Sequence, residues 1–285
     1  MSLIETIQLY KLSIVLSCQP TRFHAVALGG DFDQNLAFIS RLGYQGVELA
    51  IRDPQQIDYT MLYQLLDCYS LEVPAIGTGQ AWGEEHLSFT DPDPAARQMA
   101  IQRFLAHIPY AAKLGAKIII GLLRGKTQPG QDPARVEAWL VEALQQCAQA
   151  ASEKGVRLCI EPINRYETDL VNTVASGLDL IDRVGAENLG LLLDTFHMNI
   201  EEADMGAAIR QAGGRIFHFH VADSNRWHPG AGHLDFESIL HGLREVGYRG
   251  YLSGEFMPLP GPDSAAEGAI SFLRGILVRQ ESAHW

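Results

Sequence analysis

Short apolar runs alternate with amphipathic helical segments along almost the whole chain. Lys117–Leu123 is a continuous apolar run of the kind expected in a parallel strand that is covered on both faces. Ile101, Phe104 and Ile108 recur at helical spacing, as on the buried face of a helix. The runs that we predict to be strands are Leu12–Leu16, Gly46–Ala50, Val73–Gly77, Lys117–Leu123, Val156–Glu161, Leu189–Asp194, Arg215–Val221 and Tyr251–Glu255.

Helix start signals separate these strands. The pairs Asp93-Pro94 and Asp132-Pro133 each place a capping carboxylate before a proline at the first helical position. The segment Ser264-x-x-Glu267 has the spacing of a capping box for a last helix. The remaining helices are expected at about 31–43, 59–69, 176–184, near Met205 and at 235–246.

Eight strands that alternate with eight helices are typical of a (β/α)8 TIM barrel, which is an α/β fold. We therefore predict that residues 1–285 form one catalytic barrel domain. A doubly wound open sheet is the alternative, but it would have fewer units and a glycine-rich phosphate loop after its first strand. The segment Ala27-Leu-Gly-Gly30 does not match such a loop.

Composition narrows the classes of function. Apolar residues make up 47% of the chain, which is ample for one core, and no apolar run is long enough to span a bilayer. The net charge of −12 would repel a phosphate backbone. The four cysteines are scattered without a C-x-x-C pair, and Met1–Gln8 lacks the basic and hydrophobic parts of a signal peptide. We expect a reduced, cytoplasmic protein that binds neither nucleic acid nor membrane.

Polar residues close several of the predicted strands. In a barrel the carboxyl ends of the strands surround one mouth, where Glu161, Asp194, His220 and Glu255 would meet. Three carboxylates there would repel one another and take up protons unless a cation neutralised them. Together with one imidazole they suit a single Mn²⁺, Mg²⁺ or Co²⁺ ion and are less typical of structural zinc. Glu48, on the second strand, is interpreted as a buried polar residue bonded to neighbouring backbone.

Three more polar residues lie three to six positions beyond these strand ends, namely Glu167, His197 and Arg226. A short turn could bring His197 over the same mouth. Arg226 is either a counter-ion of the acidic cluster or a group that holds a substrate oxygen. The sequence leaves both interpretations of Arg226 open.

Two other polar residues receive less specific interpretations. Arg124 directly follows the fourth apolar run, where it could contact a substrate carboxylate, but an ion pair at the rim is slightly favoured. His218 alternates with apolar residues in the seventh strand and is interpreted as a satisfied core histidine.

Four segments carry a family resemblance: Glu161-Pro-Ile-Asn-Arg-Tyr-Glu167, Leu193-Asp-Thr-Phe-His197, His220-Val-Ala-Asp-Ser-Asn-Arg226 with Pro229-Gly-x-Gly-His233, and Gly254-Glu255. In order and spacing they resemble the xylose-isomerase-like sugar isomerase/epimerase barrels, and within them the ketose 3-epimerases of tagatose, psicose and ribulose. Gly77–Trp82, followed by Leu87–Thr90, is similar to the related epimerases of 5-keto-gluconate. Ser224 stands where some ketose epimerases carry a cysteine.

The resemblance implies a role for each candidate residue. Glu161 and Glu255 would serve as the acid/base pair as well as binding metal. One divalent ion is implied, with Mn²⁺ favoured over Mg²⁺, Co²⁺ or Zn²⁺. Its ligands would be Glu161, Asp194, His220 and Glu255, and the substrate contacts would be Glu167, His197 and Arg226.

Epimerisation beside a carbonyl requires the loss of a proton from one face and its return to the other. A cation that chelates the carbonyl and adjacent hydroxyl oxygens would stabilise the enediolate formed between these steps. We therefore predict an enzyme of the isomerase class, a divalent-metal-dependent epimerase or isomerase of a small keto sugar or keto-sugar acid. A homo-oligomer, either a dimer or a tetramer, is compatible with this function.

Two other functions are compatible with a barrel. A zinc phosphodiesterase of the endonuclease IV type would need several metal ions, further histidine and aspartate ligands, and a basic DNA-binding face. A sugar-binding barrel without turnover would need the pocket but not both candidate bases. Fold alone does not decide among the three.

Overall fold

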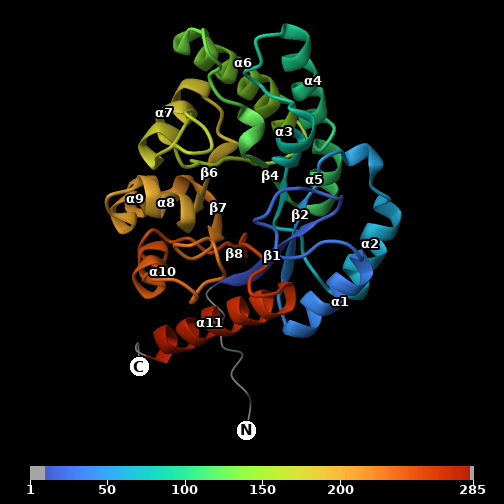
Figure 1. Ribbon diagram of the computed structural model, residues 1–285, viewed down its shortest axis with the longest axis vertical. Helices are drawn as coiled ribbons and strands as arrows, with labels where there is room; N and C mark the ends of the chain where they lie inside the picture. The colour runs from blue at the N-terminus through green and yellow to red at the C-terminus, as the bar shows by residue number, and fades with distance from the viewer. Residues whose placement is uncertain (1–9, 283–285) are drawn as a thin grey trace.

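The strands form a closed parallel barrel in the computed structural model, which describes residues 10–282. Each strand pairs with the next in sequence, and β8 pairs with β1 to close the ring (Figure 1). The predicted TIM barrel is confirmed, whereas the prediction made from Met1–Gln8 lies outside the described residues. The strands are β1 (Lys11–Ser17), β2 (Gly46–Ala50), β3 (Ala75–Gly77), β4 (Lys117–Ile120), β5 (Leu158–Ile160), β6 (Leu189–Asp194), β7 (Ile216–Val221) and β8 (Tyr251–Gly254).

The helices surround the barrel, and α11 packs beside both α1 and α10 to complete the ring (Figure 1). Within residues 10–282, no helix combines the length and apolar character needed to cross a bilayer. The helices are α1 (Phe32–Leu42), α2 (Tyr59–Cys68), α3 (Gln80–Glu85), α4 (Pro94–Leu105), α5 (Ile108–Leu114), α6 (Pro133–Ser152), α7 (Val174–Val184), α8 (Thr195–Glu201), α9 (Met205–Ala212), α10 (Phe236–Glu245) and α11 (Pro262–Ser282), with short 3-10 turns η1 (Pro54–Gln56), η2 (Leu122–Arg124) and η3 (Gly213–Arg215).

Capping carboxylates start several of these helices as the sequence predicts. Asp93 and Asp132 each accept a hydrogen bond from the first turn of α4 and α6, whose first residue is a proline. The predicted last helix is present, but its predicted start is wrong, because α11 begins at Pro262 and Ser264 lies inside its first turn. Proline at the first helical position starts this helix two residues before the supposed capping box.

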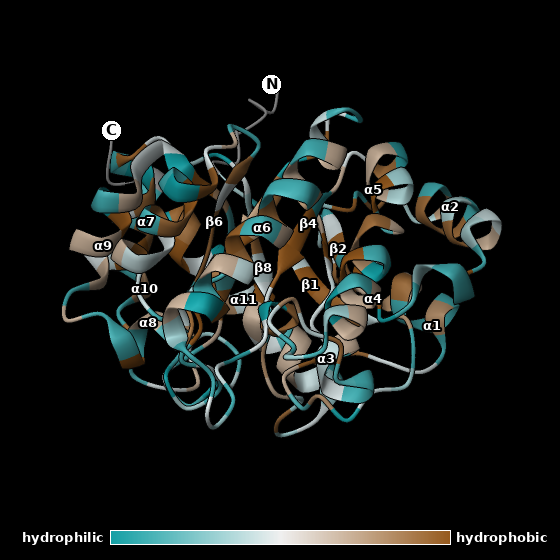
Figure 2. Cartoon of the chain, turned by 90° about the horizontal axis from the view of Figure 1, so that it is seen from above, coloured by the Kyte–Doolittle hydropathy of each residue, from teal (hydrophilic) through white to brown (hydrophobic). Residues whose placement is uncertain are grey.

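The apolar core consists of two layers, one outside the strands and one inside the barrel. The larger layer packs the outer faces of the strands against the helices. The smaller layer fills the barrel interior with Ala75, Ile119, Cys159 and Leu192, against which Phe217 packs. Figure 2 shows the apolar strands at the centre, with hydrophilic residues on the outward faces of the helices. The interior is therefore a packed core below the mouth rather than an open channel.

A register shift in β7 determines which of its side chains enter the barrel. Leu191 of β6 pairs with Ile216, but the next residue, Leu192, pairs with His218, so Phe217 is an extra residue in β7. Its ring lies against Gly190, where an added Cβ would stand 2.5 Å from the ring. Beyond the shift, His220 is level with Asp194. The shift thus brings His220 into step with the polar end of β6.

His107 is a core histidine that should make the free energy of unfolding depend on pH in the acidic range. It is fully buried, and within residues 10–282 neither ring nitrogen has a hydrogen-bond partner. Burial, with Arg103 nearby, lowers the pKa of His107 from 6.5 to about 3. Because the folded-state pKa lies below the unfolded one, its contribution to stability is complete above about pH 6.5 and is lost towards pH 3.

Replacing His107 with leucine is expected to remove this part of the acid sensitivity. As the pH falls below 6, the free energy of unfolding of the wild type should decrease relative to that of His107→Leu by about 1.4 kcal/mol per pH unit. Urea unfolding at several pH values between 4 and 7.5 measures this difference. Parallel pH profiles for the two proteins would contradict the expectation.

Candidate active site

Four predicted strand-end residues meet at one mouth of the barrel. Asp194 is the last residue of β6 and also caps α8, and it pairs in register with His220 of β7. Glu161 and Glu255 are the first residues after β5 and β8. One nitrogen or oxygen atom from each of the four side chains lies within 4.8 Å of the corresponding atom of every other. The structure therefore brings together the residues that the sequence analysis selected as metal ligands.

The facing atoms of this cluster lack ordinary partners. Among the described residues, Glu161 Oε1, Asp194 Oδ2 and His220 Nδ1 are buried without any hydrogen-bond partner. His220 Nδ1 lies 3.9 Å from Glu161 Oε1, 4.0 Å from Asp194 Oδ2 and 3.8 Å from Glu255 Oε2. Buried polar atoms are rarely left unpaired, and each costs about 1–3 kcal/mol. Three carboxylates and an imidazole around one point form a donor set that fits a divalent cation.

The electrostatics of the cluster also fit a cation. Burial, and then Glu255, raise the pKa of Glu161 well above its usual range. Burial raises the pKa of Glu255 to about 7, although His220 and Arg226 oppose this shift. Burial would lower the pKa of His220, but Glu48, Glu255 and Glu161 together raise it to about 10. Without a cation, the cluster therefore holds protons at neutral pH that a metal would displace.

His197 lies beside the cluster in a defined tautomer. Its Nδ1 lies 2.8 Å from Asn164 Nδ2, and an amide nitrogen only donates. The imidazole therefore accepts at Nδ1 and carries its proton on Nε2, which lies 3.7 Å from Glu161 Oε1. Burial, followed by Arg226, lowers the pKa of His197 well below its usual value. His197 thus presents a neutral N–H group to the mouth.

Arg226 and Glu167 form the polar wall next to Glu255. Arg226 Nη1 donates to Glu167 Oε1 at 2.9 Å, and Nη2 lies 3.5 Å from Glu255 Oε2. The guanidinium lies 5.4 Å from the ring centre of Phe23 and 4.8 Å from that of Phe196. Arg226 is therefore a counter-ion of the acidic residues. Its Nε is buried and has no partner among the described residues, which leaves one donor for a substrate oxygen.

A cavity of about 270 Å³ connects these groups. Glu161, Glu167, His197, His220, Arg226 and Glu255 all line it. Its opposite wall comes from the segment after β1 and from α3, where Glu84 accepts hydrogen bonds from Thr21 Oγ1 at 3.1 Å and from the backbone N–H of Arg22 at 2.6 Å. Part of this wall, Gly77–Gln80, lies in a segment noted in the sequence only for its family resemblance. Thr21, Arg22 and Glu84 were not selected from the sequence.

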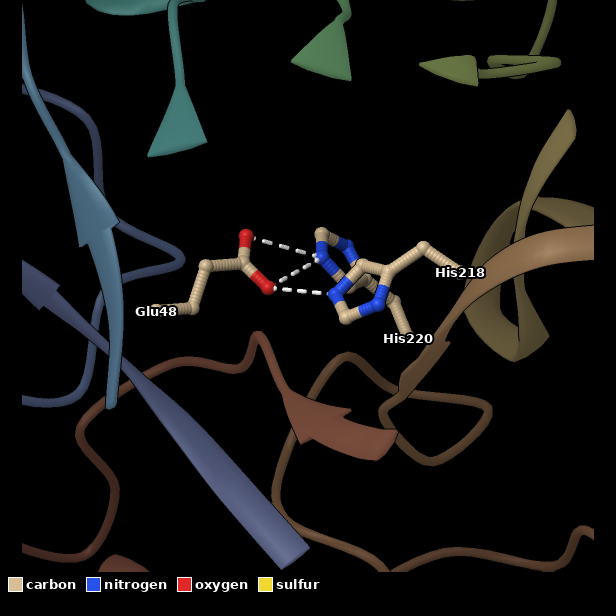
Figure 3. Close-up of side chains that lie close together, drawn as sticks. All are labelled: Glu48, His218 and His220. Atoms are coloured by element: carbon tan, nitrogen blue, oxygen red, sulfur yellow. Dashed lines mark hydrogen bonds and ion pairs between the residues drawn. The ribbon is translucent and has the colours of Figure 1, made fainter. Parts of the chain in front are cut away.

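Glu48 crosses the barrel interior to reach the two histidines of β7 (Figure 3). Its Oε2 lies 2.7 Å from His218 Nε2, and its two oxygens lie 3.0 and 3.1 Å from His220 Nε2. The expectation of backbone partners for Glu48 is therefore wrong. His218 is only half satisfied, because its Nδ1 is buried without a partner among the described residues. These three residues form the second acidic and histidine cluster of the described chain.

Arg124 does not lie at the rim, and both interpretations made from the sequence are wrong. Its side chain is fully buried in η2. The guanidinium donates to backbone carbonyls of Gly121, Leu170 and Val171, and also to that of Glu161. It therefore braces the chain that follows β4 and β5 and offers no group to a substrate carboxylate.

Replacing Arg124 with alanine is expected to destabilise the fold without changing substrate preference. Each carbonyl left buried and unpaired costs about 1–3 kcal/mol, so the free energy of unfolding should fall by several kcal/mol. Denaturant unfolding measures this loss. Arg279→Ala, which removes an exposed arginine paired with Glu237, is the control and should change stability by less than about 1 kcal/mol. A selective loss of activity on keto-sugar acids at unchanged stability would contradict the expectation.

Comparison with known proteins identifies the family to which this fold belongs. The sequence pattern described as the xylose isomerase-like TIM barrel matches residues 36–276. The chain belongs to the xylose isomerase-like TIM barrel family. It is 35% identical over 241 residues to an L-ribulose 3-epimerase from Methylomonas sp. (strain DH-1), covering 81% of this chain and 82% of that protein.

Solved structures of xylose isomerase-like barrels agree with this assignment. The structure of an L-ribulose 3-epimerase has a TM-score of 0.82 and 28% identity, covering 96% of this chain and 97% of that one. A D-allulose 3-epimerase from Methylomonas sp. in complex with D-allulose has a TM-score of 0.79 and 28% identity, covering 93% of this chain and 97% of that one. These relatives are named as epimerases, in agreement with the prediction of an isomerase-class enzyme.

The sequence did not reveal the contacts of two residues that lie beside the site, Asn164 and Glu48. Asn164 fixes the tautomer of His197, although it lies inside the quoted segment that begins at Glu161. Its position between two candidate site residues was a usable signal. Glu48 was noticed, but no local pattern indicates that its partners lie 170 residues away.

Proposed function

We propose that the chain is a divalent-metal-dependent epimerase of a small keto sugar or keto-sugar acid. One observation carries this proposal: three buried ligand atoms without partners among the described residues, on Glu161, Asp194 and His220, face one another beside Glu255. Membership of a family whose relatives include ketose 3-epimerases supports the reaction class.

Glu161, Asp194, His220 and Glu255 would hold the ion, and Mn²⁺ is our first choice among divalent metals. When bound, the cation would supply a Lewis acid for the carbonyl and the adjacent hydroxyl oxygen of the sugar. Oxygen donors dominate the set, which favours Mn²⁺, Mg²⁺ or Co²⁺ over a structural zinc.

Glu161 and Glu255 would transfer the protons. They follow strands that are not neighbours in the barrel, and both line the cavity, so a substrate between them meets one carboxyl group on each side. Inversion needs one group ionised to take a proton and the other protonated to return it. Mutual repulsion of close carboxylates favours such a state with one shared proton.

His197, Arg226 and Glu167 would orient the substrate. The Nε2–H of His197 and the free Nε–H of Arg226 both donate into the cavity, where oxygen gains negative charge as the proton leaves. Glu167 is held by Asn164 and Arg226 at 2.9 Å each, so its carboxylate accepts from a sugar hydroxyl in a fixed position. These groups bind and hold the sugar while the two glutamates move its proton.

The cellular setting is part of the same proposal. We propose that residues 1–285 act as one catalytic domain in the cytoplasm, either as a dimer or as a tetramer. The four cysteines are free in the structure, which fits a reducing compartment. Size-exclusion chromatography with light scattering determines the oligomeric state.

Proton exchange with solvent tests the reaction. Ketoses and keto-sugar acids are incubated with the Mn²⁺-loaded protein in D₂O, and loss of the C–H signal beside the carbonyl is followed by NMR together with formation of the epimer. We expect deuterium at that carbon in both epimers of the preferred substrate. A metal-loaded protein that exchanges no proton from any of these sugars would overturn the proposal.

Metal stoichiometry separates this function from a phosphodiesterase. Among the described residues, the two clusters suited to a cation share His220, and the second is already hydrogen-bonded internally. We therefore expect one ion per chain. Three tightly bound zinc ions with cleavage of abasic DNA would instead identify a zinc phosphodiesterase.

A further inference from the structure

Glu48 contacts the imidazole of His220 from behind, at Nε2, which lies on the other side of the ring from the Nδ1 atom that faces the cluster (Figure 3). It projects from β2, which is separated from β7 by β1 and β8 in the barrel. Its side chain is 2% exposed. Its carboxylate forms hydrogen bonds to His218 and His220.

The chemistry of this contact fixes where the protons lie. An ionised carboxylate only accepts hydrogen bonds, so both imidazoles must donate to Glu48 from Nε2. A metal-binding imidazole must be neutral and then carries one N–H, so once the ion has displaced the second proton of His220, the proton on Nε2 leaves a lone pair on Nδ1. In His220 that Nδ1 is the atom facing Glu161, Asp194 and Glu255 at 3.8–4.0 Å.

We infer that Glu48 is a positioning residue that forces His220 to bind the metal through Nδ1. This inference rests on the proposed function, because it concerns the same ion. Without the carboxylate, the neutral ring is free to place its proton on Nδ1 and donate it to the three facing carboxylates, which would compete with metal binding. A carboxylate behind a ligating histidine also raises the basicity of the ligand nitrogen.

His218 holds the carboxylate of Glu48 in place through a hydrogen bond. The shortest contact of the carboxylate, at 2.7 Å, is with His218 Nε2, and the two imidazole planes meet at 79°. The same Oε2 atom also accepts from His220 at 3.1 Å. Because the register shift at Phe217 precedes both histidines, they share one orientation towards Glu48. One carboxylate thus fixes two rings, of which only His220 reaches the mouth.

Metal affinity tests the inference independently of catalysis. Mn²⁺ binding to wild type, Glu48→Gln and Glu48→Asp is measured by the EPR signal of free Mn²⁺. We expect both variants to bind about 10–100-fold more weakly, the usual effect of losing a carboxylate behind a metal-bound histidine. Glu72→Gln is the matched control, because Glu72 also has two partners, Lys11 and Tyr251, but at the opposite end of the strands. It should bind Mn²⁺ as wild type does.

The tautomer gives a second readout that needs no variant of Glu48. The ring nitrogens are observed by ¹⁵N NMR in ¹⁵N-histidine-labelled wild type loaded with Mg²⁺ or Zn²⁺. The signals of His220 are assigned as those that are missing from the spectrum of His220→Gln. We expect a proton on Nε2 and the metal on Nδ1. A proton on Nδ1, or wild-type Mn²⁺ affinity in folded Glu48→Gln, would overturn the inference.

The outcomes also separate this inference from the proposed function. If wild type binds one ion and epimerises a ketose while Glu48→Gln binds Mn²⁺ equally well, the positioning role fails alone. If wild type binds no divalent ion, the proposed function fails with it. Two ions per chain, with the second on Glu48, His218 and His220, would make Glu48 a ligand itself and would overturn the positioning role.

Discussion

Glu255→Gln is expected to abolish epimerisation, with a loss of about 10²–10⁴-fold from removal of one proton transfer. The remaining base, Glu161, still serves its own face of the sugar. Exchange of the substrate proton with D₂O should therefore survive from one epimer and disappear from the other. Glu161→Gln should leave the complementary exchange, so the two variants together assign each glutamate to a face.

Metal occupancy must be measured alongside this prediction, because both glutamates are also candidate ligands. An amide carries no charge and binds a cation more weakly, so each variant is assayed at saturating Mn²⁺ with the bound ion counted. Glu237→Gln, which changes an exposed carboxylate on α10, is the matched control and should keep wild-type activity. Near-wild-type epimerisation in both fully metallated variants would rule out the two-base mechanism.

Metal affinity is expected to fall steeply with decreasing pH, which is the second large effect. A metal binds the deprotonated ligands, so every ligand proton present in the free protein must leave. The pKa of His220 is raised to about 10, so one proton is displaced between pH 7 and 10. Below the pKa of Glu255, which is about 7, a further proton opposes binding. Each displaced proton weakens binding about tenfold per pH unit.

Calorimetry in buffers of different ionisation enthalpy counts the protons released. We expect a slope of at least one in the plot of log affinity against pH above pH 7, and a steeper slope below it. Removing the ion with a chelator should abolish activity, and Mn²⁺ should restore it. A pH-independent affinity between pH 6 and 9 would contradict the pKa shifts that the buried cluster implies.

The mouth residues could be predicted from the sequence because each stands beside an apolar run. A parallel barrel brings all strand ends to one edge, so Glu161, Asp194 and His220 converge without any knowledge of long-range contacts. The helix starts at Asp93 and Asp132 were predictable for a similar reason, since a cap and the proline after it are local signals.

Other features depend on contacts that leave no local pattern. Arg124 has the same sequence environment whether its guanidinium reaches the mouth or turns onto backbone carbonyls, and only the fold decides. The extra residue in β7 is a matter of pairing between two strands, which periodicity alone does not reveal. At the last helix two start signals overlap, and proline at 262 prevails over the supposed cap at Ser264.

The two halves of the barrel supply different parts of the candidate site. All four candidate ligands follow or belong to β5–β8, whereas β1–β4 and their loops provide much of the facing wall, including Thr21, Arg22 and Glu84. A chimaera that exchanges the first half for that of a related barrel would therefore change the shape offered to the sugar and keep the donor set intact. The carboxylate that contacts His220 comes from the exchanged half. The incoming sequence must therefore supply an acidic residue at position 48.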